Sequence, residues 1–358
     1  MSPPILAKYE DFVLHNAPQI SGLESGLRSL TYLLPGRFEN SDMASEAIFT
    51  FVNLMSLYHD TILSTAALRQ QPETPATKFN RYTRYMLRSG STYKRVAYTL
   101  TIVQMCEVLM EMGARRVGGR RGRERVVVGV EIAKVICRTI LLKLSRNRMT
   151  MHATVPERDY DPATVEPPPT SPSEHPATWK GTRTGKEHIR VDHITKSDKG
   201  GYDHAVQYLL SKALTEAAIS PMDLLRPIVT ARRKVSEWMF VLRPLVYVLA
   251  LRRYGPSSYK PYLLSLTMEV LSLTASLSPS TLGFRRDLTI LEREQYKRRY
   301  WLLLYYLLRN PFYEQWTKER MGAFIEGASR RPLISLLAGI LRDYQPLWEK
   351  WHFYTSGY

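Results

Sequence analysis

Two pairs of residues have the types and spacing that acid–base chemistry needs. Glu107 and Glu111 lie four positions apart, which places both carboxylates on one face of a helix. Two neighbouring carboxylates can divide acid and base roles, but no matching ligand or nucleophile accompanies them. We therefore expect them to contact the nearby arginines. His59 and Asp60, adjacent on the polar side of a predicted helix, are interpreted as an incidental pair.

The motifs of the common catalytic and cofactor sites are absent from the sequence. It has no Gly-rich phosphate loop followed by Lys and Ser/Thr, and no G-x-G-x-x-G, G-x-S-x-G or H-E-x-x-H string. Cys106 and Cys137 are the only cysteines, which excludes a disulfide scaffold and a cysteine-rich zinc module. The sequence predicts no enzyme activity, no metal, no cofactor and no small-molecule substrate.

Positive charge is the strongest compositional signal. Fifty Lys and Arg against 33 Asp and Glu give a net charge of +17, which favours anionic partners. Six arginines gather directly before an apolar segment, where such a cluster binds anionic lipid headgroups with about 1 kcal/mol per residue and favours a cytosolic N-terminal region. These are Arg115, Arg116, Arg120, Arg121, Arg123 and Arg125.

Two other partners fit this composition. The Gly-Arg character of the cluster also suits RNA, so a basic RNA-binding protein is one alternative function. The sequence lacks the aromatic strings and loops of the common RNA-binding modules, and we expect no nucleic-acid partner. The other alternative is a soluble helical adaptor.

Two apolar segments are candidates for membrane contact. Val126–Leu144 carries Glu131, Lys134 and Arg138 at positions i, i+3 and i+7, which forms one charged stripe on an apolar helix. Such a helix can face lipid while the stripe faces other helices or water, or it can lie buried in a soluble bundle. Trp238–Leu251 is interrupted by Arg243 and Pro244. Arg243 joins the other three residues in a predicted intramembrane polar stripe.

The chain divides into three regions. Residues 1–148 and 201–358 are apolar-rich and show the 3–4 spacing of helix faces. Residues 149–200 hold seven prolines among polar residues, which predicts a disordered linker. Helices are expected at 42–69, 81–113, 124–147, 203–219, 229–254, 259–277, 287–309 and 331–342. The predicted fold is an all-α, membrane-associated multi-helix bundle with a disordered central linker.

Three strings resemble the peroxin-16 family of peroxisomal membrane biogenesis proteins. The first is Tyr9–Leu63, in which Tyr32–Phe38 (YLLPGRF) is the most specific part. The second is Cys106–Ala114 (CEVLMEMGA), and the third is Leu302–Trp316 (LLLYYLLRNPFYEQW), followed by a closing Phe353-Tyr354. They occur in the family's order, and the resemblance extends over most of the chain outside 149–200.

The resemblance implies a non-enzymatic protein that is required for assembly of the peroxisomal membrane. It implies recruitment of peroxin-3, which docks peroxin-19 with newly made membrane proteins, and it implies residence in the peroxisomal membrane with an endoplasmic reticulum stage. Family members described as integral have two spans, which align with about 125–146 and 235–255 here. The charges in these segments leave peripheral attachment open as an alternative.

The residues of the first two strings are also candidates for a docking face. The candidate partner-docking residues are Leu33, Leu34, Gly36, Arg37, Phe38, Glu107, Glu111, Met112 and Gly113. Turn glycines and apolar helix faces usually serve packing, so a structural role for the same residues is the alternative.

Overall fold

The computed structural model of the chain describes residues 4–35, 41–70, 77–158, 178–180, 187–189, 220–276, 288–329 and 334–356. Of the predicted docking residues, Gly36, Arg37 and Phe38 lie outside this part. So do the predicted helix 203–219 and most of the predicted linker.

Helices form nearly all of the described structure, as predicted. They are α1 (Pro4–His15), α2 (Ala17–Leu33), α3 (Ser41–Gln70), α4 (Lys78–Ser89), α5 (Ser91–Leu144), α8 (Ala231–Tyr254), α9 (Tyr259–Ser276), α10 (Ile290–Leu302), α11 (Lys318–Ser329) and α12 (Ser335–Lys350). Shorter helical turns are η3 (Pro221–Leu224), η4 (Leu303–Leu308), η5 (Tyr313–Thr317) and η6 (Phe353–Thr355). The exception is an antiparallel pair of short strands, β1 (Thr178–Lys180) and β2 (Glu187–Ile189).

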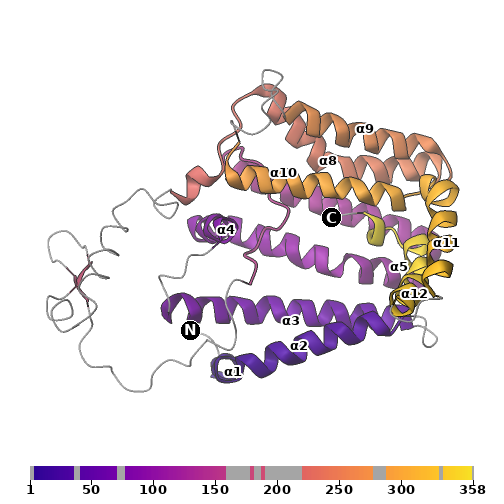
Figure 1. Ribbon diagram of the computed structural model, residues 1–358. Coiled ribbons are helices and arrows are strands. Elements are labelled where there is room, and N and C mark those ends of the chain that lie inside the picture. Colours follow the sequence, from indigo (N-terminus) through magenta and orange to yellow (C-terminus); the bar gives the residue numbers. More distant parts are fainter. Residues whose placement is uncertain are drawn as a thin grey trace.

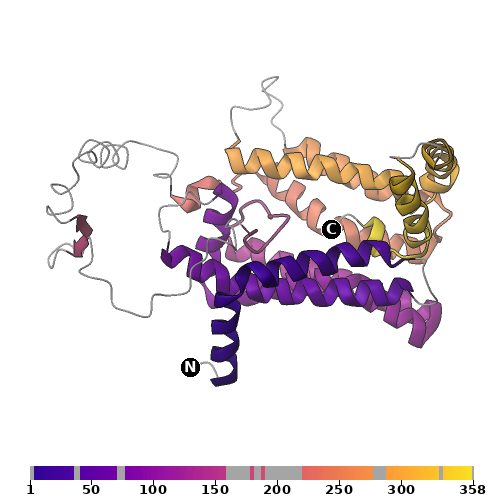
Figure 2. The ribbon, with the colours of Figure 1, turned by 60° about the horizontal axis from the view of Figure 1, so that its bottom comes forward.

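The long helices lie side by side in layers (Figure 1). α2 and α3 form one outer layer, α4 and α5 lie in the middle, and α8 and α9 form the opposite outer layer with α10. α11 and α12 gather at one end, near the turn between α8 and α9 (Figure 1). The rotated view in Figure 2 keeps α10 and the α2–α3 layer on opposite sides.

Two glycines divide the sequence around α5 differently from the prediction. Gly90 is extended and ends α4, so the predicted helix 81–113 is two helices. Gly119 has φ +59° and ψ −150° inside α5, a conformation that a residue with a Cβ rarely adopts. The halves 91–118 and 120–144 therefore form a hairpin, and the arginine cluster surrounds its turn.

Contacts between the halves of α5 show that they run antiparallel. Arg123 meets Glu111 near the turn, and Lys134 meets Glu107 farther from it. Beyond these pairs, both halves join α4 and α10 in the largest apolar core, which buries Tyr82, Leu100, Leu141 and Leu291 among others.

The beginning of the predicted linker is packed, which corrects its boundary. Met149 is buried in the main core, and the amide of Asn80 exchanges two hydrogen bonds with the backbone of Glu157, at 2.8 and 2.9 Å. Arg158 pairs with Asp60 of α3 at 2.6 Å. Residues 149–158 contain one proline, and their polar groups form hydrogen bonds and ion pairs with α3 and α4. The prediction rested on the average composition of 149–200, which does not distinguish these first ten residues from the rest.

Three helices were not predicted: α1, α2 and α11. α11 contains Gly322 and Gly327, which weaken a helix in isolation. It is stabilised by tertiary contact, because Ile325 and Ala328 pack against Ala338 of α12.

No helix among the described residues is both long and apolar enough to cross a membrane. The predicted span near 125–146 is the second half of α5, and the one near 235–255 is α8 with Pro244 inside it.

Candidate functional site

The C-terminal segment Trp351–Ser356, which we call the C-terminal anchor, lies where α3, α5, α8 and η4 come together. Its short helix η6 contacts α5, α12 and η4. Phe353 is buried against Val127, Val130 and Val248, so it seals the interface between the α5 hairpin and α8.

Glu111 holds the start of the anchor. Its fully buried carboxylate accepts the backbone N–H groups of His352 at 2.8 Å and Phe353 at 3.1 Å. The same carboxylate accepts Arg123 Nε at 2.7 Å. One buried carboxylate therefore accepts three donors, two of which are backbone N–H groups of the anchor.

Arg309 holds the end of the anchor. Its guanidinium donates to the carbonyl of Thr355 at 3.1 Å and of Ser356 at 2.7 Å. The rings of Tyr247 and Tyr306 lie 4.6 and 4.5 Å from it, the range of cation–π contacts. The planar fork of arginine suits two adjacent carbonyls, which a lysine could not bridge in the same way.

A third contact fixes the anchor to α3. The hydroxyl of Tyr354 donates to Glu46 Oε2 at 2.9 Å. Burial raises the pKa of Glu46, and the Tyr354 hydrogen bond opposes that shift.

The three strings of the family resemblance thus meet at one place. Glu46 belongs to the first string, Glu111 to the second and Arg309 to the third, and all bind the closing residues of the chain. Sequence reasoning missed this convergence. The only signal was that Phe353-Tyr354 formed part of the resemblance.

The predicted docking residues of the second string lie mostly in the interior, which favours the alternative that they serve packing. Glu107, Glu111 and Met112 are 4, 0 and 3 % exposed. Met112 packs against Leu347 and Trp351, so it supports the anchor. Gly113 is half-buried, as is Leu34, and Leu33 ends α2.

The predicted polar stripe faces the interior of the bundle. Lys134 is fully buried, and its Nζ lies 2.9 Å from Glu107 and 2.6 Å from Glu131. It also lies 4.9 Å from the ring centre of Phe353. Burial raises the pKa of Glu107 to about 7, with Lys134 opposing the shift. Arg138 is 7 % exposed on the same face.

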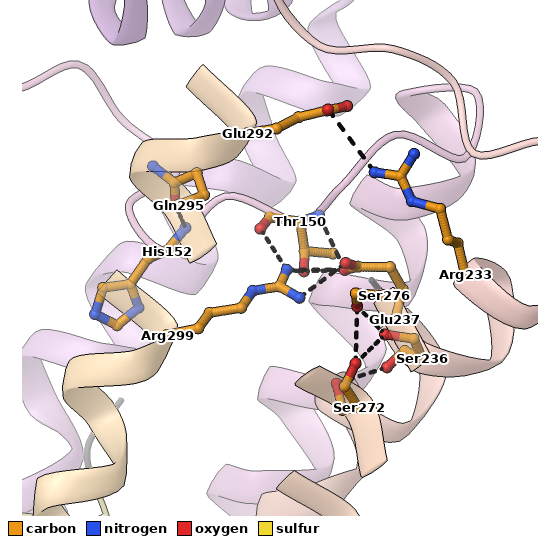
Figure 3. Close-up of polar contacts among 10 residues, drawn as sticks. All are labelled: Thr150, His152, Arg233, Ser236, Glu237, Ser272, Ser276, Glu292, Gln295 and Arg299. Carbon is orange, nitrogen blue, oxygen red and sulfur yellow. Dashed lines mark hydrogen bonds and ion pairs between the residues drawn. The ribbon is translucent and has the colours of Figure 1, made fainter. Parts of the chain in front are cut away.

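A second set of buried charges joins α8 to α9 and α10. Arg243, the fourth stripe residue, forms an ion pair with Glu269 of α9, and both are buried. Figure 3 shows Arg299 of α10 pointing between Glu237 and Thr150. Arg299 reaches the two Glu237 oxygens at 2.8 and 2.9 Å. Thr150, in the segment that follows α5, is therefore hydrogen-bonded to both α8 and α10.

Small hydroxyl residues form the contact between α8 and α9. Ser236 Oγ donates to the Ser272 carbonyl at 2.6 Å, and Ser272 Oγ donates back to the Ser236 carbonyl at 3.0 Å (Figure 3). Ser276 joins the same cluster. Side chains this small let the two backbones approach closely.

The outer side of these helices is apolar. α9 buries Ser265, Glu269 and Ser272, which are all fully inaccessible. It exposes large apolar residues instead, and the neighbouring helices do the same. This surface, the apolar outer face, consists of Leu249 on α8, Leu263, Leu264, Val270 and Leu271 on α9, Trp301 on α10, and Leu304 and Leu307 on η4, each 43–62 % exposed.

The predicted arginine cluster surrounds the turn of α5. Arg115, Arg116, Arg120, Arg121 and Arg125 are exposed, and Arg123 is half-buried because it binds Glu111. Five members of the cluster therefore face solvent, and Arg123 forms part of the packed structure.

The adjacent pair His59 and Asp60 separates. His59 Nδ1 lies 2.6 Å from Glu24 and its Nε2 lies 2.7 Å from the hydroxyl of Tyr9, whereas Asp60 binds Arg158. This network links α1, α2 and α3. Among the described residues, no three His, Cys, Asp or Glu side chains gather as metal ligands.

Comparison with known proteins gives one consistent result. Residues 7–350 match the family Pex16, described as peroxisomal membrane protein. The chain is 22% identical to peroxisome biogenesis protein 16 of Arabidopsis thaliana, over 92% of this chain and 94% of the relative. It is 20% identical to peroxisomal membrane protein PEX16 of Schizosaccharomyces pombe, over 92% of each.

A third relative matches a shorter segment of the chain with a higher percentage of identical residues. The chain is 32% identical to peroxisome biogenesis factor 16 of Dictyostelium discoideum over 125 residues, which are 35% of this chain and 31% of the relative. No solved structure matches the chain.

Proposed function

The chain belongs to the Pex16 family of peroxisomal membrane proteins, and we propose from this premise that it serves peroxisome biogenesis as a helical scaffold lodged in the peroxisomal membrane. The family is not an enzyme family. The observation that carries the proposal is the apolar outer face of α8, α9, α10 and η4. Large apolar side chains that stay exposed on neighbouring helices mark a partner or a membrane when they form one patch.

The contacts in the interior of the same helices support the proposal that lipid, and not water, lies against the apolar outer face. Arg243–Glu269 and Arg299–Glu237 are buried ion pairs, and serines form the α8–α9 contact. In a membrane, helices gain little from burying leucine against leucine, and they associate through small residues and polar contacts. Ionisable residues then face the interior of the bundle. α9 has this distribution.

The apolar outer face does not require a complete crossing. α8 and α9 pack as a hairpin, and the arginine cluster at the turn of α5 lies near the end where α8 meets α9 (Figure 1). An apolar face held in one leaflet, with arginines at the headgroups, is consistent with these positions.

The family also leads us to propose recruitment of peroxin-3, which then docks peroxin-19 and newly made membrane proteins, with a stage at the endoplasmic reticulum. α2 offers a surface for such a partner. Leu23, Leu27 and Leu30 are 68, 41 and 46 % exposed and follow helical spacing toward Leu34. α2 and α9 lie on opposite sides of the bundle (Figure 1).

Alkaline carbonate extraction of peroxisomal membranes tests the membrane proposal. We expect the wild-type protein to stay in the pellet. A variant with Leu263→Gln, Leu264→Gln and Leu271→Gln should move to the supernatant, because it makes the apolar outer face polar. The matched control, Leu23→Gln, Leu27→Gln and Leu30→Gln on α2, should stay in the pellet. Release of the wild-type protein overturns the proposal.

The same two variants test recruitment in the opposite sense. The α2 variant should lose co-precipitation with peroxin-3 while it remains membrane-bound. Unchanged co-precipitation would remove α2 from the docking surface.

A further inference from the structure

A cavity of about 370 Å³ opens between the turn of the α5 hairpin and the end of α8. Its lining holds both charged and apolar residues. The charged residues are Arg115, Arg120, Arg123, Glu124 and Arg252, the apolar residues are Val127, Val128, Val248, Leu251 and Pro256, and His352 of the C-terminal anchor also lines the cavity.

Not every guanidinium group in the lining of the cavity pairs with a carboxylate of the described residues. Arg123 binds Glu111, and Arg120 binds Glu124 at 3.1 Å. Arg115 stacks on Trp351 with its guanidinium carbon 5.2 Å from the ring centre. Neither Arg115 nor Arg252 pairs with a carboxylate in the part of the chain that the structure describes. An anion in the cavity would therefore meet two uncompensated positive charges.

The two sources of positive charge come from different elements. Arg115 precedes the turn of α5, whereas Arg252 lies in the last turn of α8, 137 positions along the chain. Arginines that only lay against a flat membrane surface would not need to line one cavity from two different elements. Forked guanidinium groups from two elements suit the oxygens of a phosphate.

His352, which also lines the cavity, adds no charge to it. Burial and the nearby Arg309, Lys134 and Arg123 hold the pKa of His352 well below its ordinary value. The imidazole is therefore neutral at physiological pH.

The apolar residues of the lining favour a ligand that has an apolar part beside its anionic group. Val127 and Val248 are buried, and Leu251 and Val128 are half-buried. A free inorganic phosphate would make no apolar contact with these residues. The cavity is too small for a whole phospholipid, but it can take a headgroup and the first part of an acyl chain.

We infer that this cavity binds the phosphate of a single anionic phospholipid, with Arg115 and Arg252 on the headgroup and the start of an acyl chain along Val128 and Leu251. The inference rests on the proposed function, since the chain must continue into the bilayer. It makes the arginine cluster a lipid-selective site.

Calorimetric titration of the purified full-length protein in a non-ionic detergent tests this binding. The probes are dioctanoyl phosphatidic acid, dioctanoyl phosphatidylcholine and inorganic phosphate. We expect saturable binding of phosphatidic acid, and binding at least about tenfold weaker for each of the other two. Inorganic phosphate that binds as tightly as phosphatidic acid overturns the lipid assignment.

Matched variants locate the site. Arg252→Glu should weaken the affinity for phosphatidic acid by at least about tenfold, because it replaces an attractive charge by a repulsive one. Its exposed neighbour Arg253 does not line the cavity, and Arg253→Glu makes the same change in net charge. We expect a change below about threefold for it. Equal weakening by both overturns the inference in favour of general surface attraction.

A second pair of variants tests the apolar part of the cavity lining. Val128→Phe fills the cavity and should weaken binding, whereas Val117→Phe places the same ring at a position that is 92 % exposed. Unchanged binding in both overturns the inference. Circular dichroism confirms that each variant is folded. Carbonate extraction distinguishes the two proposals, because Arg252→Glu should remain in the membrane pellet even where phosphatidic acid no longer binds.

Discussion

Glu111 accepts the backbone N–H of Phe353 across 242 positions of sequence, at 3.1 Å. This hydrogen bond closes the chain onto α5 and seats Phe353 between α5 and α8. Because Glu111 also holds Arg123, it couples the C-terminal anchor to the arginine-rich turn. Glu111, a residue of the second string of the family resemblance, therefore has a structural role.

Loss of the Glu111 carboxylate should release the anchor. Glu111→Gln leaves one oxygen for three donors, and hydrogen bonds to charged groups contribute about 1.5–3 kcal/mol each. We expect a lower thermal unfolding midpoint and earlier proteolytic removal of the C-terminal residues. Glu124→Gln is the control, because Glu124 forms an exposed pair with Arg120. Equal midpoints for the two variants would contradict the role of Glu111.

Lys134→Met should be among the most damaging single substitutions. It leaves Glu107 and Glu131 buried without their shared cation, which typically costs about 3–5 kcal/mol. The free energy of unfolding in denaturant measures this loss. Adding Glu107→Gln and Glu131→Gln removes the stranded charges and should recover most of it. A triple variant as unstable as Lys134→Met would show that packing, and not charge, sets the cost.

Gly119→Ala should destabilise the α5 hairpin through backbone strain alone. No atom lies within 4 Å of the added Cβ, but φ is +59°. Such strain costs on the order of 1–3 kcal/mol. Gly118→Ala, at the adjacent helical position, also meets nothing within 4 Å and should be neutral or slightly stabilising. Thermal unfolding compares the two, and equal effects would exclude the proposed turn.

Acidification should destabilise the protein through His152. Burial, with the charge of Arg138 next, lowers its pKa from 6.5 to about 4. Between these values the unfolded chain binds a proton at His152 that the folded chain does not bind. His152 therefore costs no stability above pH 6.5 and lowers the free energy of unfolding progressively as the pH decreases from 6.5 to about 4.

The difference between wild type and His152→Gln isolates this contribution. Relative to the variant, the wild-type free energy of unfolding should drop by roughly 2 kcal/mol from pH 7 to pH 5. His15→Gln is the control, since the His15 side chain is 52 % exposed. Subtraction is needed because Glu107, with its raised pKa, contributes the opposite slope between pH 4.5 and about 7. Parallel profiles for wild type and His152→Gln would refute the assignment.

The amino-acid sequence by itself determined the helices with strong periodicity and the composition of their faces. The spacing of Glu131, Lys134 and Arg138 predicts one stripe on one helix, and the structure places all three on the interior side. The sequence also showed the arginine cluster around Gly119, and five of its six members are exposed in the structure, since adjacent like charges need water or an anionic partner.

Only the tertiary structure decided which face of each helix points inward. The 3.6-residue period groups Ser265, Glu269 and Ser272 together and the leucines of α9 opposite them, but both orientations satisfy that period. The buried carboxylate of Glu269 is tolerated because Arg243 of α8 meets it, and Glu111 is tolerated because the end of the chain supplies its donors. These partners lie far apart in sequence, and a buried charge is stable only when they are in place.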